Sequence, residues 1–400
     1  MSMRTPAGFI SAFYDPLKNP DAPTGVTGTG GDASASIAFT APTNTGGSAI
    51  TAYYAVANDG TTGTAASSPV TVTGLTNGTS YTFQVWALNS YGPGVWSAAS
   101  GSVTPAASRG LFGGGGSNTN IIDYVTITTT GNATNFGYLT SGRFGVGACG
   151  STSRGLFAGG STAYNSAGNL SNINYVTFAS TGNGTTFGNL TQARFGLAGC
   201  NSSTRGVFGG GSNGSGTQYS TMDYVTINST GNAISFGSLS VGGGFFTSAS
   251  GSSTRGIFGG GTNSLGSDVS SITYITIAST GNSTSFGNLT STSSAIASCS
   301  SSTLSIFGGG RTFYGTSNVI DYITIATTGN AIDFGDLTVG RSALGACSSS
   351  TRGIFGGGYS SSNVIDYVTI ASAGNATDFG DLTLARDTVS ACSSSNGGVQ

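Results

Sequence analysis

The 400-residue sequence contains no histidine and no glutamate, and its only lysine is Lys18. Charged residues make up 6% of the chain, against about 25% in an average globular protein. Without histidine the chain can form neither a His-ligated zinc or copper site nor a Ser-His-Asp triad. A net charge of −2 leaves no basic stripe for nucleic acid. We therefore expect no cofactor, no metal site and no nucleic-acid partner.

Long apolar runs are also missing. No stretch approaches the ~18–20 apolar residues of a membrane span, and Pro6 and Gly8 interrupt the apolar segment near the N-terminus. We expect neither membrane insertion nor a signal peptide. The five cysteines are an odd set at near-equal spacing, namely Cys149, Cys200, Cys299, Cys347 and Cys392. This pattern favours small buried side chains on equivalent strands over a disulfide framework.

The residues that are abundant favour an all-β protein. There are 69 glycines, and Thr, Val, Ile, Tyr and Phe are common while helix formers are scarce. Such a composition is typical of strands joined by tight turns. The sequence divides into an N-terminal extension (1–21), a first domain (22–105) and a repeat region (108–400).

Residues 22–105 alternate between short strand patterns and turn residues, as expected for a β-sandwich. The predicted strands are Ala35–Phe39, Ala52–Ala57, Val70–Thr73, Tyr81–Asn89 and Ala98–Val103. Leu75, a turn and then Tyr81 on a strand form the tyrosine-corner pattern. With Pro23, Tyr53 and Gly92, this segment resembles a fibronectin type III domain. It departs from that family at Phe39, where Trp is usual. The resemblance implies a spacer or adhesive module without catalysis.

From Ser108 onward three short motifs recur six times. The first is Arg-Gly-[Leu/Val/Ile]-Phe-Gly-Gly and its variants, as in Arg109–Gly114. The second contains Asp-Tyr-[Val/Ile]-Thr-Ile, with its tyrosines 45 to 51 residues apart from Tyr124 to Tyr367. The third is Gly-Asn-x-x-x-Phe-Gly-x-Leu, which ends the copy at Phe379. Each copy reads as four strands, and we expect the Gly-Asn pair to form a tight turn with positive φ before the fourth strand.

Four strands per repeat of about 50 residues resemble kelch repeats, which implies a six-bladed β-propeller. Phe stands in the fourth strand where that family usually has Trp. The first copy lacks its first strand, and residues 387–400 carry one, so we expect the C-terminal strand to complete blade one and close the propeller. The alternative geometry is a β-solenoid with shorter rungs and open ends.

The connections between the second and third strands are long and differ between copies, which is where binding sites usually lie on a uniform scaffold. Candidate ligand-binding residues on them are Tyr164, Tyr219, Asp268, Arg311, Phe313 and Tyr314. Aromatic rings beside hydroxyl and amide donors suit a neutral glycan. The alternative is a set of solvated loops without a ligand.

The N-terminal extension is unusually apolar, with Phe9, Ile10, Phe13, Tyr14 and Leu17. It either packs on its own domain or docks into a larger assembly. In the repeats, arginines follow the fourth strand (Arg143, Arg194, Arg341 and Arg386) or open the second strand. We expect them to tie neighbouring blades through aspartates such as Asp123 or through carbonyls. An anion-binding ring is the alternative.

Enzyme activity is not expected. Galactose oxidase shares the kelch architecture but needs histidine ligands, and the carboxylate pairs Asp333/Asp336 and Asp378/Asp381 repeat with the motif. The opening segment, the fibronectin-like domain and the kelch-like repeats together resemble virion proteins of tailed phages, particularly cyanophages. That resemblance implies a structural appendage of the tail or capsid in the virion, which contacts other virion proteins and a host-surface glycan or receptor. A bacterial cell-surface adhesin and a scaffold for protein partners are the alternatives, and the oligomeric state stays open.

Overall fold

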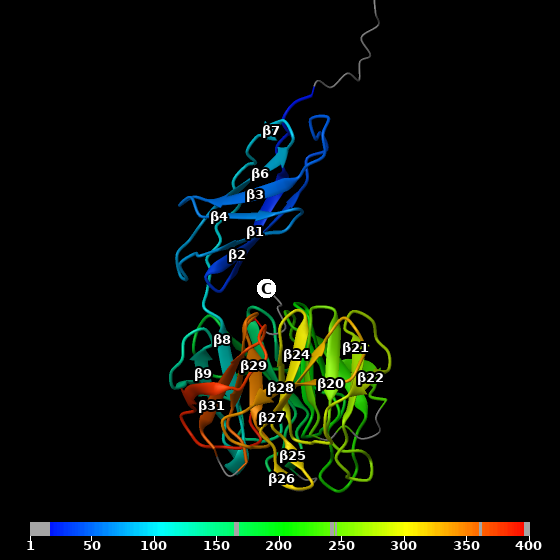
Figure 1. Ribbon diagram of the computed structural model, residues 1–400. Helices are drawn as coiled ribbons and strands as arrows, with labels where there is room; N and C mark the ends of the chain where they lie inside the picture. The colour runs from blue at the N-terminus through cyan, green and yellow to red at the C-terminus, as the bar shows by residue number, and fades with distance from the viewer. Residues whose placement is uncertain (1–16, 164–167, 241–243, 245, 360–361, 396–400) are drawn as a thin grey trace, which may run out of the picture. The chain divides into compact units, whose positions relative to one another are not determined.

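The computed structural model describes residues 17–163, 168–240, 244, 246–359 and 362–395. The chain divides into two compact units, 1–107 and 108–399, and both are built from β-strands (Figure 1). Within the described ranges no helix is long and apolar enough to cross a membrane. The one helix that appears there is a single 3₁₀ turn, η1 (Gly116–Asn118). The protein is therefore all-β.

The N-terminal unit is a sandwich of two sheets. One sheet has the order β1 (Thr24–Gly31), β2 (Ser34–Thr40) and β5 (Val70–Thr73). The other has the order β4 (Thr62–Ala65), β3 (Ala52–Ala57), β6 (Phe83–Asn89) and β7 (Gly92–Pro93). Alternate residues of these strands point inward and form one core. This is the period-2 pattern of a strand with one buried face.

The tyrosine corner forms as the sequence predicts. Tyr81 is buried, and its hydroxyl accepts a hydrogen bond from the backbone N–H of Thr76 at 2.9 Å. Phe39 packs on Tyr53 with ring centroids 4.8 Å apart, so it fills its core position without the tryptophan usual there. The corner fixes the connection between the two sheets by a side chain that is also part of the core.

The predicted strand Ala98–Val103 is wrong as a continuous strand. Only Val103 forms a bridge, with Tyr81. The Ser97 hydroxyl accepts from the N–H of Val85 at 2.8 Å, and the Ser100 hydroxyl accepts from the N–H of Phe83 at 3.0 Å. These side chains take bonds that a backbone carbonyl would accept in a regular ladder, which interrupts the strand.

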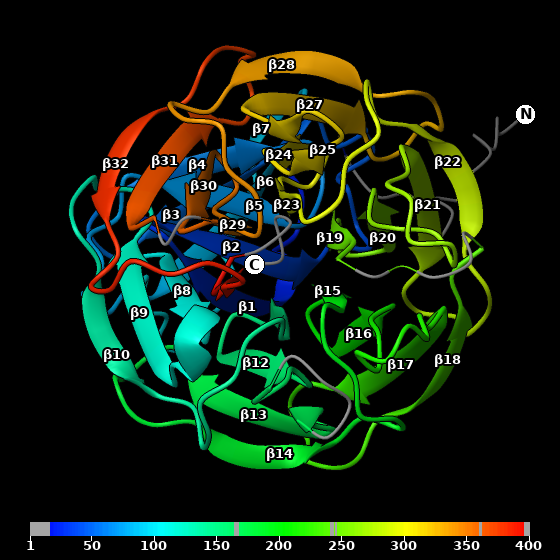
Figure 2. The ribbon, with the colours of Figure 1, turned by 90° about the horizontal axis from the view of Figure 1, so that it is seen from below.

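Within the described residues, the C-terminal unit contains six four-stranded antiparallel sheets, which stand around a common axis (Figure 2). We number them 1 to 6 and call their strands inner, second, third and outer. The inner strands of sheets 1 to 6 are β33 (Ser390–Ser393), β11 (Gly147–Gly150), β15 (Ala198–Asn201), β19 (Ser248–Gly251), β23 (Ala297–Ser300) and β29 (Gly345–Ser348). The second strands are β8 (Arg109–Gly113), β12 (Arg154–Ala158), β16 (Arg205–Gly209), β20 (Arg255–Gly259), β24 (Leu304–Gly308) and β30 (Arg352–Gly356).

The third and outer strands complete each sheet toward the rim. The third strands are β9 (Ile121–Thr126), β13 (Asn172–Thr177), β17 (Thr221–Thr226), β21 (Ser271–Thr276), β27 (Val319–Thr324) and β31 (Val364–Thr369). The outer strands are β10 (Thr134–Tyr138), β14 (Thr185–Asn189), β18 (Ile234–Ser238), β22 (Thr284–Asn288), β28 (Ile332–Asp336) and β32 (Thr377–Asp381). A short hairpin of β25 (Arg311–Thr312) and β26 (Gly315–Thr316) projects from sheet 5.

The core of this unit lies between sheets. Each of its six hydrophobic clusters combines side chains from two neighbouring sheets. In the second strands, every residue after the first is buried, because these strands have a sheet on each side. One cluster joins Phe112 of sheet 1 to Ile354 and Phe379 of sheet 6.

Chain segments far apart in sequence meet where sheet 6 adjoins sheet 1. Strand β33 pairs antiparallel with β8, with Cys392 opposite Leu111. One residue shortly before the inner strand of each sheet has a left-handed backbone, with φ of 51° to 67° across the six sheets. Each N–H donates to the carbonyl of the equivalent residue in the preceding repeat at 2.6–3.2 Å. These six residues, which we call the collar, are Gly145, Gly196, Phe246, Ala295, Ala343 and Thr388.

The Gly-Asn pairs do not form the predicted tight turns. Each of the six glycines instead donates its N–H to the carbonyl of the outer-strand Phe of the preceding repeat, as Gly131 does to Phe379 at 2.8 Å. The Asn side chain then accepts an N–H from the same outer strand, as Asn132 does from Asp381 at 3.0 Å. A Cβ on the outer-strand Gly380 would lie 2.5 Å from the Gly131 carbonyl oxygen. Both glycines of the motif therefore serve a contact between repeats.

Candidate functional site

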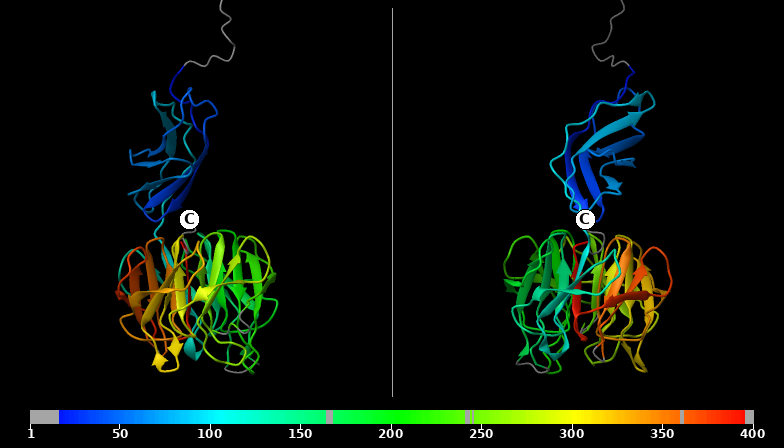
Figure 3. Two further views of the ribbon diagram at one scale, coloured as in Figure 1. Left: turned by 45° about the vertical axis from the view of Figure 1, so that its right-hand side comes forward. Right: turned by 90° about the vertical axis from the view of Figure 1, so that its left-hand side faces the viewer.

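The long connections between second and third strands lie together at one end of the C-terminal unit, which we call the loop face. In Figure 1 the hairpin β25–β26 marks this end at the bottom of the unit, and Figure 3 shows the same yellow hairpin from two other sides. Bridges such as Ser294 with Arg311 and Phe195 with Ser212 join these connections to the segment that leads into the inner strand of the same sheet. The loops are therefore anchored at their bases.

Two of the loops have the same internal build. In sheet 3 the Asn213 carboxamide oxygen accepts the N–H groups of Ser215 and Thr217 at 2.9 and 3.0 Å. In sheet 4 the Asn263 oxygen accepts those of Leu265 and Ser267, both at 3.0 Å. These asparagine-centred turns hold the loops in one shape. They differ at the tip, where the first loop has Ser215 and the second has Leu265, which is 88% exposed.

The neighbouring loop of sheet 5 carries two aromatic rings at its tip. Phe313 is 91% exposed and Tyr314 is 96% exposed, and their rings meet edge to face with centroids 5.3 Å apart. The turn between β25 and β26 closes through Gly315, whose φ is 126°. Large apolar groups are rarely this exposed without a binding role when they occur as a group.

One ion pair links the loops of sheets 4 and 5. The Arg311 guanidinium lies 3.2 Å from the Asp268 carboxylate. Arg311 is largely exposed, so the pair adds little stability. The pair does show that the hairpin that bears Phe313 and Tyr314 lies beside the loop that bears Leu265.

The structure thus brings four predicted residues together, namely Asp268, Arg311, Phe313 and Tyr314. Tyr219 is half-buried in the loop of sheet 3, and its N–H bonds to Gly211. Tyr164 lies outside the described residues. Sequence reasoning missed Leu265, although the comparison of two loops of equal length, one with Ser and one with Leu at the tip, could have found it.

Of the five predicted docking residues, the structure describes Leu17. Phe9, Ile10, Phe13 and Tyr14 lie outside the described residues. Leu17 is 61% exposed.

The repeat arginines are structural, as predicted. Those that open second strands donate to carbonyls of the next sheet, for example Arg109 to Phe178 at 2.6 Å. Each also stands over the Tyr of its own sheet, at 4.3–5.2 Å from the ring centroid. Every described arginine of the repeats except Arg311 uses its guanidinium to bond to a neighbouring sheet. These groups are therefore not available to form a ring of anion-binding arginines.

The four arginines that follow outer strands are fully buried between sheets. Three meet a carboxylate of the next sheet, in the pairs Arg194–Asp223 (3.2 Å), Arg341–Asp366 (2.5 Å) and Arg386–Asp123 (2.9 Å). The fourth, Arg143, meets the side-chain oxygens of Asn172 and Asn174 at 2.5 and 2.8 Å. Burial without a carboxylate lowers the pKa of Arg143 to about 10.

All five cysteines are buried on inner strands, and burial raises the thiol pKa of Cys200 and Cys299 to about 12. Each Sγ lies against a second-strand glycine of the next sheet. A Cβ on Gly206 would be 2.7 Å from Cys149 Sγ. Between sheets 4 and 5 both partners change together, and the hydroxyls of Ser250 and Ser305 meet at 2.6 Å.

This exchange gives a first prediction. Cys149→Ser should leave a buried hydroxyl without a partner, and Gly206→Ser should collide with Cys149, so each single change should cost about 1–3 kcal/mol of unfolding free energy. The double variant should regain most of that loss, because its two serine hydroxyls can form a hydrogen bond equivalent to the one between Ser250 and Ser305. Denaturant unfolding in a double-mutant cycle measures the coupling. Additive losses would mean that the two positions do not interact.

The axis of the six sheets holds a cavity of about 90 Å³ beside the collar. Its lining is uncharged, with small residues such as Ala148, Ala249 and Ser298 beside larger ones such as Phe246 and Ile296. Across the described ranges, no three His, Cys, Asp or Glu side chains lie close enough together to hold a metal ion. Hydroxyls such as those of Ser248 and Thr388 are the polar side-chain groups of this lining.

Comparison with known families agrees with the first unit. Residues 21–102 match the fibronectin type III domain model, and with the tyrosine corner they are a fibronectin type III domain at the N-terminal end of an all-β chain. A search of curated proteins found no match to the chain.

Proposed function

We propose that residues 108–400 form a kelch-like six-bladed β-propeller closed by the C-terminal strand. Three kinds of contact that repeat between neighbouring sheets also join the last repeat to the first. They are the collar hydrogen bond from Gly145 to Thr388, the bond from Gly131 to Phe379 and the ion pair of Arg386 with Asp123. The pairing of β33 with β8 adds the fourth. A solenoid with open ends has no such contacts between its first and last repeats.

The function that the geometry supports best is attachment without catalysis. The observation that carries it is the group of apolar tips on the loop face, Leu265, Phe313 and Tyr314, which stand in solvent on anchored loops. Most of the charged and aromatic side chains of the repeats are occupied in contacts between sheets. The scaffold is therefore rigid, and the loop tips are what varies on it.

In this proposal the protein is a structural appendage of a phage virion that adheres to the host surface through the loop face. Residues 1–21 dock to other virion proteins, and the fibronectin type III domain is the spacer. The ligand is a host-surface glycan or receptor that stacks on Phe313 and Tyr314 and bonds to Arg311 and Asp268. Ring faces beside polar side chains are the usual elements of glycan recognition.

A pair of substitutions tests the loop face. Phe313→Ser with Tyr314→Ser should reduce binding of the full chain to host envelopes at least tenfold with an unchanged melting temperature, because both rings are already in water. Ile332→Ser is the matched control: it removes an apolar side chain that is 59% exposed from β28 of the same sheet. Equal binding by both variants would remove the loop face from the mechanism.

Immunolabelling of purified particles and of host envelopes tests the biological setting. Label on particles at the tail or capsid supports the virion appendage. Label on envelopes with clean particles favours a cell-surface adhesin, and capture of cytosolic proteins alone favours a scaffold.

A further inference from the structure

The interface between sheets 4 and 5 departs from the buried Arg–Asp pattern. At the position after the outer strand where four repeats have arginine, sheet 4 is followed by Ser293, which is 5% exposed. Sheet 5 nevertheless keeps the carboxylate that would meet an arginine, at Asp321, which is also 5% exposed. A buried carboxylate is costly without a cation beside it.

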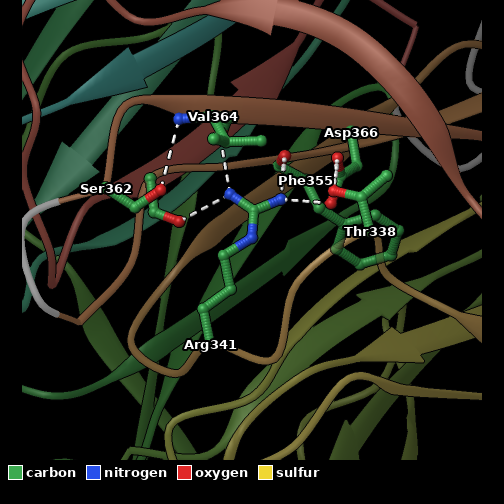
Figure 4. A network of polar contacts seen from close by, with 7 residues as sticks. Thr338, Arg341, Phe355, Ser362, Val364 and Asp366 are labelled. Carbon is green, nitrogen blue, oxygen red and sulfur yellow. Dashed lines mark hydrogen bonds and ion pairs between the residues drawn. The ribbon is translucent and has the colours of Figure 1, made fainter.

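Arg341, one interface further on, shows what normally occupies this position (Figure 4). Its guanidinium donates to the carbonyls of Phe355, Gly357 and Val364 at 3.3, 2.8 and 2.5 Å. It also donates to Asp366 at 2.5 Å. The four acceptors form a cradle of oxygen atoms with a single negative charge, which matches one cation.

Sheet 5 has the same four acceptors. Phe307, Gly309, Val319 and Asp321 stand at the positions of Phe355, Gly357, Val364 and Asp366 in the repeat. Together with Ser293 and Ser317 they line a small cavity of about 10 Å³. That volume is close to the smallest that holds one water molecule. The cavity is present because the short side chain of Ser293 does not fill the space that corresponds to the guanidinium of Arg341 at the next interface.

The balance of donors and acceptors at this cavity favours a cation. Among the described residues, the hydrogen bonds that Asp321 accepts come from Thr290, through its N–H at 2.9 Å and its hydroxyl at 2.8 Å. The carboxylates of Asp123, Asp223 and Asp366 accept from an equivalent threonine and from an arginine as well. Burial raises the pKa of Asp321, which is the direction expected of a carboxylate whose arginine has been lost.

We infer that the cavity between Ser293 and Asp321 is a binding site for one water-sized monovalent cation, of which ammonium is the model. Ammonium offers N–H donors like those of a guanidinium, at the size of a water molecule. Before sheet 4 the sequence also has no arginine at this position, where it has Gly243, and there Thr273 stands at the position of the aspartate. A cation is needed only where the carboxylate has been kept.

The test is thermal unfolding of the full chain in chloride salts of equal ionic strength. The melting temperature of the C-terminal unit should rise by about 2 °C or more when ammonium replaces tetramethylammonium, which is too large for the cavity. Parallel arms with sodium and potassium show which water-sized cation binds best. An effect in either of these arms, but not in tetramethylammonium, also supports the site.

Two variants locate the effect. Ser293→Arg places a guanidinium in the cradle from the chain itself, so it should raise the melting temperature in tetramethylammonium chloride and abolish the dependence on cation type. Asp321→Asn removes the charge and should abolish that dependence as well. It serves also as the second variant if the arginine does not fit. A melting temperature independent of the cation, or the same dependence in both variants, would overturn the inference.

Discussion

Truncation of the chain after Arg386 is expected to unfold the C-terminal unit as a whole. The deletion removes β33, whose Cys392 and neighbour Val389 are buried in the clusters at both sides of sheet 1. It also exposes the inner edge of β8 and breaks both collar hydrogen bonds of Thr388. A sheet edge that opens into a hydrophobic core cannot be satisfied by water without losing the packing around it.

The two units can be followed separately in this experiment. Both tryptophans, Trp86 and Trp96, lie in the N-terminal unit, where Trp86 stacks on Tyr54 at 4.1 Å. Tryptophan fluorescence should therefore keep its folded transition, while the second transition by circular dichroism disappears and trypsin cleaves at the repeat arginines. Truncation after Ser395 is the control, because it leaves β33 in place. Two unchanged transitions after truncation at Arg386 would contradict the closure that we propose.

Much of this architecture could be predicted because the same three motifs occur six times in the sequence. The strands around Tyr124 and Phe136, the buried cysteines and the tyrosine corner at Tyr81 each follow from local patterns. Each of these patterns involves residues that are close together in the sequence. Local periodicity and turn chemistry are the information that a single sequence carries best.

What could not be predicted depends on the neighbouring repeat. The Gly-Asn pairs looked like turns because turn preference is local, whereas their N–H groups bond to an outer strand of the preceding repeat, about 45 residues away in most cases and at the other end of the unit for Gly131. Ser250 and Ser305 look like two unrelated departures until their hydroxyls meet. For the candidate site, aromatic residues in loops were visible in the sequence, but the pairing of Arg311 with Asp268 and the exposure of Leu265 needed the positions of two loops.

The buried ion pair of Arg386 and Asp123 should contribute the second large effect. Arg386→Met keeps much of the side-chain volume but leaves the Asp123 carboxylate fully buried with only Thr383 as a partner among the contacts described here. Breaking a buried pair in this way typically costs about 3–5 kcal/mol. The loss falls between sheet 6 and sheet 1, where the two ends of the repeat region meet, so it should appear in the unfolding of the whole C-terminal unit.

Arg143 provides a matched control in the same molecule. It is equally buried, but its partners are Asn172 and Asn174, so Arg143→Met leaves no uncompensated charge and should cost clearly less. Chemical denaturation of both variants measures the difference. Adding Asp123→Asn to Arg386→Met should recover part of the stability, because the remaining group is then neutral. If Arg386→Met and Arg143→Met lose the same free energy, the carboxylate contributes nothing and the arginines act by packing alone. That result would also weaken the case for a cation beside Asp321, since both arguments rest on the cost of a buried carboxylate without a positive partner.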